Sequence, residues 1–264
     1  MTRQHISYSE FKIWNDCPHK HKLNYIDNIA GFEGNIYTAF GTAIHSVCEE
    51  HIVDDSVDTE QHFKKIFLQE LKKLPESVKN DMSLTMVEDM REQGISLSPL
   101  AIPALREHFG EFELVSIEEK LYEPITEFED KEFKFKGFID LVIKTSDNKY
   151  HVIDWKTCSW GWKPQKKSDK MITYQLTFYK HYFALKHGIN PEDIETHFAL
   201  LKRTAKKDNV EIFRVSSGTK KTTNALNLLK KALHNINQKK YLKNRNSCQT
   251  PFGPCEFWKT EHCQ

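Results

Sequence analysis

Two aspartates and a lysine, close together in the chain, have the side chains needed for metal-assisted hydrolysis. Asp140 lies in one strand-like run (133–144), and Asp154 and Lys156 lie in the next (149–157), with a turn-rich segment between the runs. This pattern predicts a β-hairpin, and residues two apart on a strand point to the same face. Two carboxylates can bind Mg²⁺ or Mn²⁺, and a nearby lysine can help to activate a water molecule and offset phosphate charge. The three residues therefore indicate phosphodiester hydrolysis.

Four of the six cysteines form a second pattern. One lies near the N-terminus and three lie in the last 17 residues: Cys17, Cys248, Cys255 and Cys263. Four thiolates suit a [4Fe–4S] cluster or a tetrahedral Zn²⁺ ion, and the gaps of six and seven residues are wider than in a common zinc ribbon. Such a centre would tie the two ends of the chain together, whereas the alternative is four unrelated thiols.

Two expected helices carry further polar candidates. Gln175 and Tyr179 are four residues apart, so they share a helical face, and both can hydrogen-bond phosphate or base edges. The alternative for Tyr179 is ordinary core packing with its aromatic neighbours. His45 lies on a partly apolar helix, where a single histidine is more often a packed core residue.

The loop that follows the second strand is rich in aromatic and basic residues. Aromatic side chains stack on unpaired bases and lysines contact the phosphate backbone, so the loop is a candidate DNA-contacting segment. The alternative is that its tryptophans anchor the loop to the core. The residues concerned are Trp160, Trp162, Lys163, Lys166 and Lys167.

Together these motifs resemble a known nuclease family. Gly137-x-x-Asp140, thirteen further residues and Asp154-Trp-Lys156 resemble the core of the PD-(D/E)xK nucleases, and more narrowly their RecB-like branch. The segments 41–45 and 175–179 and the split four-cysteine set resemble other motifs of that branch. The resemblance spans residues 7–263 and includes phage-encoded and CRISPR-adaptation exonucleases.

The resemblance implies roles for the candidate residues. It implies Lys156 as a catalytic residue, Gln175 and Tyr179 as substrate-orienting residues, and an iron–sulfur cluster rather than Zn²⁺ at the cysteines. It implies these ligands of the catalytic Mg²⁺ or Mn²⁺ ion: His45, Asp140, Asp154 and the backbone carbonyl of Trp155.

A glutamate on the strand before the G-x-x-D strand often completes the acidic cluster in this family. Glu118 and Glu119 are both candidates for that position. The alternation of side chains along a strand does not show which of them points inward.

Composition and charge are consistent with such a function. The chain has 264 residues, of which 39% are apolar and 28% charged, and it has no 18-residue apolar run that would predict a membrane helix. The N-terminus lacks the apolar core of a secretory signal, so we expect the cytoplasm of a bacterial or phage-infected cell. Residues 156–247 contain 20 Lys/Arg and 6 Asp/Glu, although the whole chain has a net charge of +1. This basic segment suits a polyanionic substrate, and the alternative is a solvated lysine-rich surface.

The order of predicted elements indicates a mixed α/β fold. Helices are expected first, then three strands, a helix, two strands and a last basic helix. Their ranges are 7–16, a helix that begins with 19–26, 40–53, 58–74, 76–93, 99–109; 112–125, 133–144, 150–157; 169–188; 196–203, 209–216; 218–241. We expect a restriction-endonuclease-like mixed central sheet flanked by helices. The expected organisation is one nuclease domain (1–264) with a helical insertion (54–110), and residues 17 and 244–264 supply the metal-cluster elements.

The expected activity is that of a metal-dependent deoxyribonuclease. We expect an exonuclease that acts on single-stranded or end-containing DNA and leaves 5′-phosphates, in recombination, replication or DNA-end processing. Partners from recombination, replication or CRISPR adaptation follow from the same resemblance. The alternative is a non-catalytic DNA-binding or partner subunit, and the intact set of Asp140, Asp154 and Lys156 argues against it. The sequence leaves cleavage polarity, exonuclease or endonuclease mode, and DNA or RNA preference open.

Overall fold

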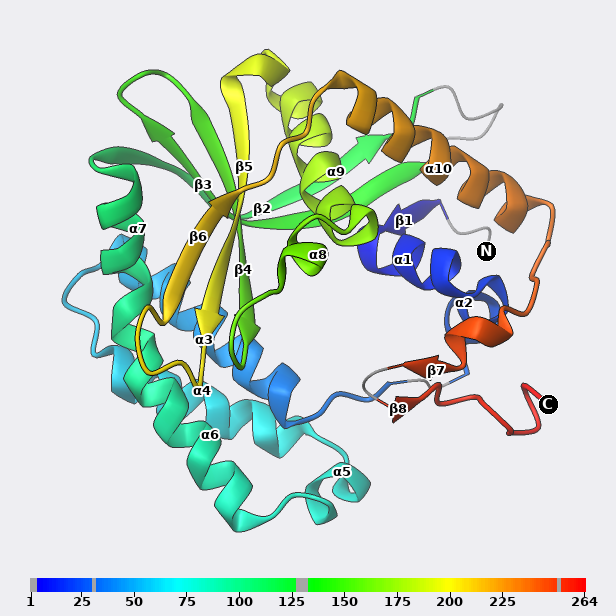
Figure 1. Cartoon of the computed structure of the whole chain (residues 1–264), viewed down its shortest axis with the longest axis horizontal. Helices are drawn as coiled ribbons and strands as arrows, with labels where there is room; N and C mark the ends of the chain where they lie inside the picture. The colour runs from blue at the N-terminus through cyan, green and yellow to red at the C-terminus, as the bar shows by residue number, and fades with distance from the viewer. Residues whose placement is uncertain (1–3, 30–31, 127–132, 251–252) are drawn as a thin grey trace.

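Helices cover both faces of a central mixed sheet (Figure 1). A computed structural model of the chain describes residues 4–29, 32–126, 133–250 and 253–264. Among these residues the main sheet has six strands in the order β1-β3-β4-β5-β6, with β2 pairing with β3 along its other edge. The strands are β1 (His5–Ser7), β2 (Phe112–Pro124), β3 (Lys134–Thr145), β4 (Tyr150–Cys158), β5 (Ile194–Lys202) and β6 (Val210–Arg214).

The pairing pattern makes β3 and β4 the centre of the sheet. The pairs β2–β3, β3–β4 and β5–β6 are antiparallel, whereas β1–β3 and β4–β5 are parallel. The hairpin expected with its turn at residues 145–148 is confirmed as the β3–β4 connection. A strand buried on both faces reads as a nearly continuous apolar run, and β5 is buried at seven of its nine positions.

One face of the sheet is covered by α1 (Tyr8–Asp16), α9 (Lys170–His187) and α10 (Thr219–Asn237). The start of α1 was expected from Ser7, whose hydroxyl accepts the Glu10 backbone N–H at 3.2 Å. The end of α9 was expected at Gly188, which adopts a left-handed conformation with φ 64°. Aromatic residues of α1 and α9 pack with Phe135 of β3 in the core of this face.

The other face is covered by α3 (Ile36–Val53), α4 (Thr59–Lys73), α6 (Leu84–Leu97) and α7 (Ala101–Phe109). The prediction of a single helix over 76–93 is wrong. The chain forms the short helix α5 (Glu76–Asn80), breaks at residues 81–83 and begins α6 after Ser83, whose side chain accepts the Met86 backbone N–H. An N-cap serine inside an apparently continuous helical pattern marks this break.

The helix α2 and the C-terminal segment lie side by side (Figure 1). The backbone N–H of His19, on α2 (Pro18–Tyr25), donates to the carbonyl of Leu242 at 3.1 Å. In the C-terminal segment, the short strands β7 (Gln249–Thr250) and β8 (Gly253–Pro254) pair antiparallel. Within the part of the chain that the structure describes, no helix is long and apolar enough to span a membrane.

Candidate active site

The sheet opens where β3 and β4 part. The β3–β4 pairing ends at Leu141 and Ile153, and the N-terminal part of the same edge of β3 pairs with β1. Asp140 and Asp154 are the next residues of the two strands, so both lie at the opening. The backbone N–H of Trp155 donates to Asp140 Oδ2 at 2.7 Å. The carboxylate thus satisfies a donor that the strand ladder no longer pairs.

Three side chains from three elements converge beside this opening. The ligand atoms of His45 on α3, Glu118 on β2 and Asp140 on β3 all lie within 4.8 Å of one another. His45 Nδ1 is 3.6 Å from Asp140 Oδ2, and the His45 ring also hydrogen-bonds the backbone of Trp155. Two carboxylates and an imidazole at this spacing suit a divalent cation such as Mg²⁺ or Mn²⁺.

Glu118, and not Glu119, lies at this group. The register of β2 and β3 sets Glu118 opposite Asp140, and its φ of 48° is a left-handed conformation that costs a non-glycine residue about 1–3 kcal/mol. Glu119 lies at α9 instead, where it accepts hydrogen bonds from Lys186 Nζ at 2.6 Å and His187 Nε2 at 2.9 Å. The choice that strand alternation left open is therefore decided by the backbone conformation at Glu118.

Asp154 is buried, with 1% of its surface exposed, and both of its oxygens have partners. Lys156 Nζ lies 2.5 Å from Oδ2, and Gln175 Nε2 donates to Oδ1 at 2.9 Å. The same amide of Gln175 donates to Tyr179 Oη at 3.1 Å. Asp154 is also close enough to Asp140 and His45 for both to shift its pKa. Its oxygens are oriented by the lysine and the glutamine.

The glycine of the G-x-x-D motif makes room for Tyr179. A Cβ atom at Gly137 would lie 2.9 Å from Tyr179 Cε1 and 3.2 Å from a ring carbon of Phe135. The tyrosine ring can therefore approach β3 closely enough for its hydroxyl to reach Gln175. Tyr179 is 6% exposed, so it packs in the core as well as contacting the polar group.

Burial shifts the ionisation of every group at the opening. It raises the pKa of Asp140 to about 7 and that of Asp154 to about 6, against the opposing effect of Lys156. Burial disfavours the charged form of Lys156, but the two aspartates outweigh it, so the pKa of its ammonium is raised. Burial lowers the pKa of His45, which favours the neutral, ligating form. The negative charges of these buried carboxylates are only partly offset by Lys156, and a bound cation would offset them further.

A family model of the PD-(D/E)XK nuclease superfamily matches residues 5–263. The chain belongs to this superfamily. It is therefore a metal-dependent nuclease by family, and the expected restriction-endonuclease-like α/β fold is confirmed. No curated protein matches the chain.

Two solved structures are similar to this nuclease over most of its length. A "Putative exonuclease" from Eubacterium rectale has a TM-score of 0.57 at 10% identity, with coverage of 93% of this chain and 86% of that one. The second, SSO0001, has a TM-score of 0.42 at 12% identity, with coverage of 89% and 77% respectively. At these identities the first likeness shows a shared fold.

A cavity of about 470 Å³ lies beside Lys156 and Gln175 of the nuclease. Its far wall is α1, which contributes Tyr8 and Lys12. Tyr8 lies close enough to Asp154 for the carboxylate to raise the pKa of its phenol further, after burial. Sequence reasoning missed these two residues. Their four-residue spacing marks one helical face, but nothing local shows that α1 packs beside α9.

The loop after β4 divides into anchoring and exposed parts. Trp162 packs against Phe198, with ring centroids 5.1 Å apart, whereas Trp160 is 75% exposed. Trp162 thus anchors the loop to the core, as the alternative interpretation of the tryptophans expected. The segment expected to be a loop contains a short helix, α8 (Pro164–Lys167). Lys166 of this helix lines the 470 Å³ cavity together with Lys156. Lys167 forms an ion pair with Glu211. Lys163 caps α8.

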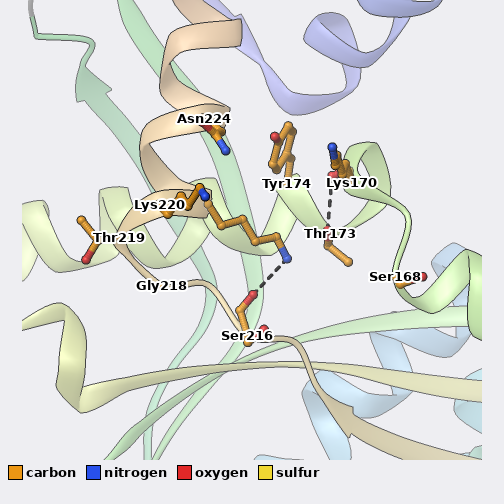
Figure 2. Close-up of a pocket in the computed structure, with 10 residues that line it drawn as sticks. Ser168, Lys170, Thr173, Tyr174, Ser216, Gly218, Thr219, Lys220 and Asn224 are labelled. Atoms are coloured by element: carbon orange, nitrogen blue, oxygen red, sulfur yellow. Dashed lines mark hydrogen bonds between the residues drawn. The ribbon is translucent and has the colours of Figure 1, made fainter.

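A second cavity, of about 620 Å³, lies between the first turns of α9 and α10 (Figure 2). Figure 2 shows Lys170 and Tyr174 on one wall and Lys220 on the other. Lys221 also lines this cavity, and its Nζ donates to the carbonyl of Ser216 at 2.9 Å. Basic side chains therefore extend from α8 towards α10.

The cysteines of the two chain ends are brought to one region. Cys17, Cys248 and Cys263 line a cavity of about 170 Å³, and the backbone N–H of Cys255 donates to the carbonyl of Cys248 at 2.8 Å. Within the described ranges, no three cysteine sulfurs lie within 4.8 Å of one another. Four thiolates around one Zn²⁺ would lie about 3.8 Å apart, so the thiols are not spaced for a single zinc ion.

Proposed function

We propose that the chain is a metal-dependent deoxyribonuclease, an exonuclease that hydrolyses single-stranded or end-containing DNA to 5′-phosphate products. One observation carries the proposal. At the opening between β3 and β4, the acidic group of His45, Glu118 and Asp140 lies beside an aspartate that is held by a protonated lysine. Carboxylates for a cation next to a fixed positive charge are the requirements of phosphodiester hydrolysis.

The residues at the opening fit a hard divalent cation. Asp140, Glu118 and His45 would hold it, and Asp154 and the Trp155 carbonyl are further ligands on the family pattern. A bound Mg²⁺ or Mn²⁺ ion would polarise the phosphate and stabilise the charge that develops during its hydrolysis. The raised pKa values of the two aspartates support this assignment, because a cation compensates the buried charge.

Lys156 and Gln175 act on the substrate side of the site. The Lys156 ammonium keeps its proton beside Asp154, so its role is to offset phosphate charge and orient the attacking water through its N–H groups. Gln175 holds Asp154 Oδ1 and lines the 470 Å³ cavity, and Tyr179 steadies the amide. In this scheme Gln175 and Tyr179 position the aspartate as well as the substrate.

The DNA strand is proposed to enter along α8. The lysines of this short helix and its neighbours line the cavities near the catalytic opening, and Trp160 is free to stack on an unpaired base. The path would include Lys163, Lys166 and Lys167 and extend to the basic cavity of Figure 2. Lys167 shares its charge with Glu211, so Lys166 is the stronger phosphate contact.

We also propose that the cysteines hold a [4Fe–4S] cluster. Each of the four thiolates binds a different iron of such a cluster, so the sulfurs lie farther apart than around one zinc ion. Three of the cysteines line one cavity between the chain ends, which supports this assignment. The cluster would tie α2 to residues 244–264 in a single nuclease domain (1–264) with a helical insertion (54–110). Thiolate ligands suit the reducing cytoplasm of a bacterial or phage-infected cell.

The RecB-like motifs further support work in recombination, replication or DNA-end processing, with proteins of these pathways or of CRISPR adaptation as partners. A solved structure of similar fold carries the name of an exonuclease, which agrees with action at ends. Partner binding is testable by co-purification from the native cell.

The test is a cleavage assay with end-labelled linear and circular single-stranded DNA of one sequence in Mg²⁺ or Mn²⁺. We expect loss of the linear strand, survival of the circle, and no cleavage with EDTA. Asp154→Asn, an isosteric change, should abolish cleavage while leaving DNA binding within about threefold. Cleavage of the circle would mean an endonuclease. Binding without cleavage under all metal conditions would instead favour a non-catalytic DNA-binding subunit.

A further inference from the structure

A second group of metal-binding side chains lies away from the catalytic opening. His151 is on β4 and Glu195 and His197 are on β5, and the parallel register pairs His151 with Glu195. His151 and Asp154 are three residues apart on one strand, so their side chains point to opposite faces of the sheet. The three residues therefore face α7 and not the 470 Å³ cavity. His151 and His197 are buried, whereas Glu195 is partly exposed and gives access from solvent.

Three ligand atoms of this group converge on one point. His151 Nδ1 and His197 Nε2 are 3.1 Å apart, and Glu195 Oε2 lies 3.9 Å from the first and 3.8 Å from the second. A tetrahedral Zn²⁺ ion with bonds of about 2.0–2.1 Å separates neighbouring nitrogen ligands by about 3.3 Å. The spacing of the two imidazoles thus matches a zinc ion, and a small movement of the exposed glutamate completes the match.

The surrounding residues fix the orientation of His151 and Glu195, whereas His197 Nδ1 is buried without a hydrogen-bond partner among the described residues. The Thr145 hydroxyl donates to Asp147 at 2.5 Å, so its oxygen accepts the Nε2–H of His151 at 2.9 Å and leaves the Nδ1 lone pair facing the group. Arg214 Nη2 binds Glu195 Oε1 at 3.0 Å, which leaves Oε2 for the imidazoles. Metal-binding histidines in proteins commonly have such a partner on their second nitrogen. Burial also lowers the pKa values of both histidines, which favours their neutral, ligating form.

We propose that His151, Glu195 and His197 form a second metal site, which binds a transition-metal ion of the zinc class and has a structural role. The ring of Phe109, the last residue of α7, packs on both imidazoles, with centroids 4.7 and 5.0 Å away. An ion here would therefore join the N-terminal ends of β4 and β5 beneath the end of α7, where the helical insertion meets the sheet. The inference is independent of the proposed nuclease activity.

The test measures zinc stoichiometry in the full-length protein. Equilibrium dialysis against Zn²⁺ followed by metal analysis is carried out on the unaltered chain, on the His151→Gln/His197→Gln double variant and on His181→Gln. His181 lies on α9 and belongs to neither metal-binding group, so it controls for the loss of a histidine. The catalytic and cysteine sites are present in all three proteins. We expect the double variant to bind one zinc ion fewer than the other two.

A second variant covers the case in which the double variant does not fold. Glu195→Gln keeps the shape of the side chain and an oxygen for Arg214. We expect it to weaken zinc binding at this site by about tenfold or more. We also expect Zn²⁺ to raise the unfolding temperature of the unaltered chain more than that of Glu195→Gln. Equal zinc content and equal affinity in all variants would overturn the proposal and leave a direct His151–His197 hydrogen bond.

Discussion

At the scale of single residues, two adjacent glutamates on β2 have different surroundings. Glu118 shares a metal-binding group with His45 and Asp140, while Glu119 accepts hydrogen bonds from Lys186 and His187. The strained φ of Glu118 is maintained by the long β2–β3 ladder on either side of it. Strain of this kind is commonly retained at sites of function, which makes Glu118 the glutamate to test.

We therefore predict opposite results for two isosteric substitutions. Glu118→Gln should lower the rate of DNA cleavage by roughly 10- to 100-fold, because it weakens the hold on the cation. Glu119→Gln, the matched control, should leave the rate within about twofold. Initial rates at a Mn²⁺ concentration below saturation of the unaltered protein measure both. An equal loss of cleavage rate in the two variants would show that Glu118 is not a metal ligand.

Lys156 gives a second prediction at this scale. Lys156→Gln removes the ammonium beside Asp154 and should reduce cleavage by about 100-fold or more, since a fixed donor at the reacting phosphate is lost. Lys72→Gln, an exposed lysine of α4, is the control. Single-turnover rates separate this effect from DNA binding. A folded Lys156→Gln protein that cleaves at the unaltered rate would refute the catalytic role.

At the scale of elements, α9 contacts its surroundings at two separate places. The body of α9 supplies Gln175 and Tyr179 to the opening, and its last turn is attached to β2 through Glu119. Burial alone raises the pKa of Glu119, but hydrogen bonds from Lys186 and His187 outweigh burial and lower it. The ionised carboxylate is therefore favoured in the folded state.

The Glu119 contact should give a pH-dependent contribution to stability. A carboxyl group whose pKa is lowered on folding stabilises the protein above its ordinary pKa, here 4.5, and loses that contribution as the pH falls through the lowered value. Glu119→Gln should reduce the free energy of unfolding by about 0.5–1 kcal/mol at pH 7, since both partners are partly exposed. Urea unfolding at several pH values measures the difference, which should disappear in acid. A difference that is constant with pH would contradict the assignment.

The short helix α8 provides a test of the DNA path. Lys166→Gln should lower the slope of log affinity against log salt concentration by about 0.7, the value for one phosphate contact on a single strand. Lys167→Gln should change the slope less, because Glu211 already neutralises that ammonium. Fluorescence anisotropy with single-stranded DNA measures the slopes. An unchanged slope for Lys166→Gln would show that α8 does not contact the DNA.

At the scale of the whole molecule, the two termini are connected by polar contacts around the cysteines. Cys17 Sγ accepts the backbone N–H of Asn244 at 3.4 Å, and His19 Nε2 lies 2.9 Å from the carbonyl of His262. Lys20 and Glu256 form an ion pair across the same junction. These contacts are few and partly exposed, so a metal cluster would supply much of the stability of the junction.

Protein purified without oxygen should contain about four iron atoms per chain and absorb broadly in the visible range. Cys17→Ser and Cys255→Ser should each lose the iron and lower the unfolding temperature, because both ends of the chain are released. Cys48→Ser, a buried cysteine of α3, should retain the iron. Metal analysis decides the outcome. One zinc per chain would support the tetrahedral alternative, and absence of metal with unaltered stability would leave ordinary thiols.

The local pattern of the sequence determined the central hairpin and the shared face of Asp154 and Lys156. Strand alternation and a turn segment act over a few residues, so they are readable without knowledge of the fold. For the same reason the ends of α1 and α9 were predictable from Ser7 and Gly188. The break between α5 and α6 was missed, although Ser83 carries a local signal for it.

Only the tertiary structure decided which distant side chains meet. The choice of Glu118 over Glu119 depends on one backbone angle in a paired strand, and Tyr8 reaches the site because α1 packs beside α9. Likewise, Trp162 is an anchor because β5 supplies Phe198 beneath it. These contacts are set by strand register and helix packing over long sequence separations, and periodicity in a single sequence carries no information about either.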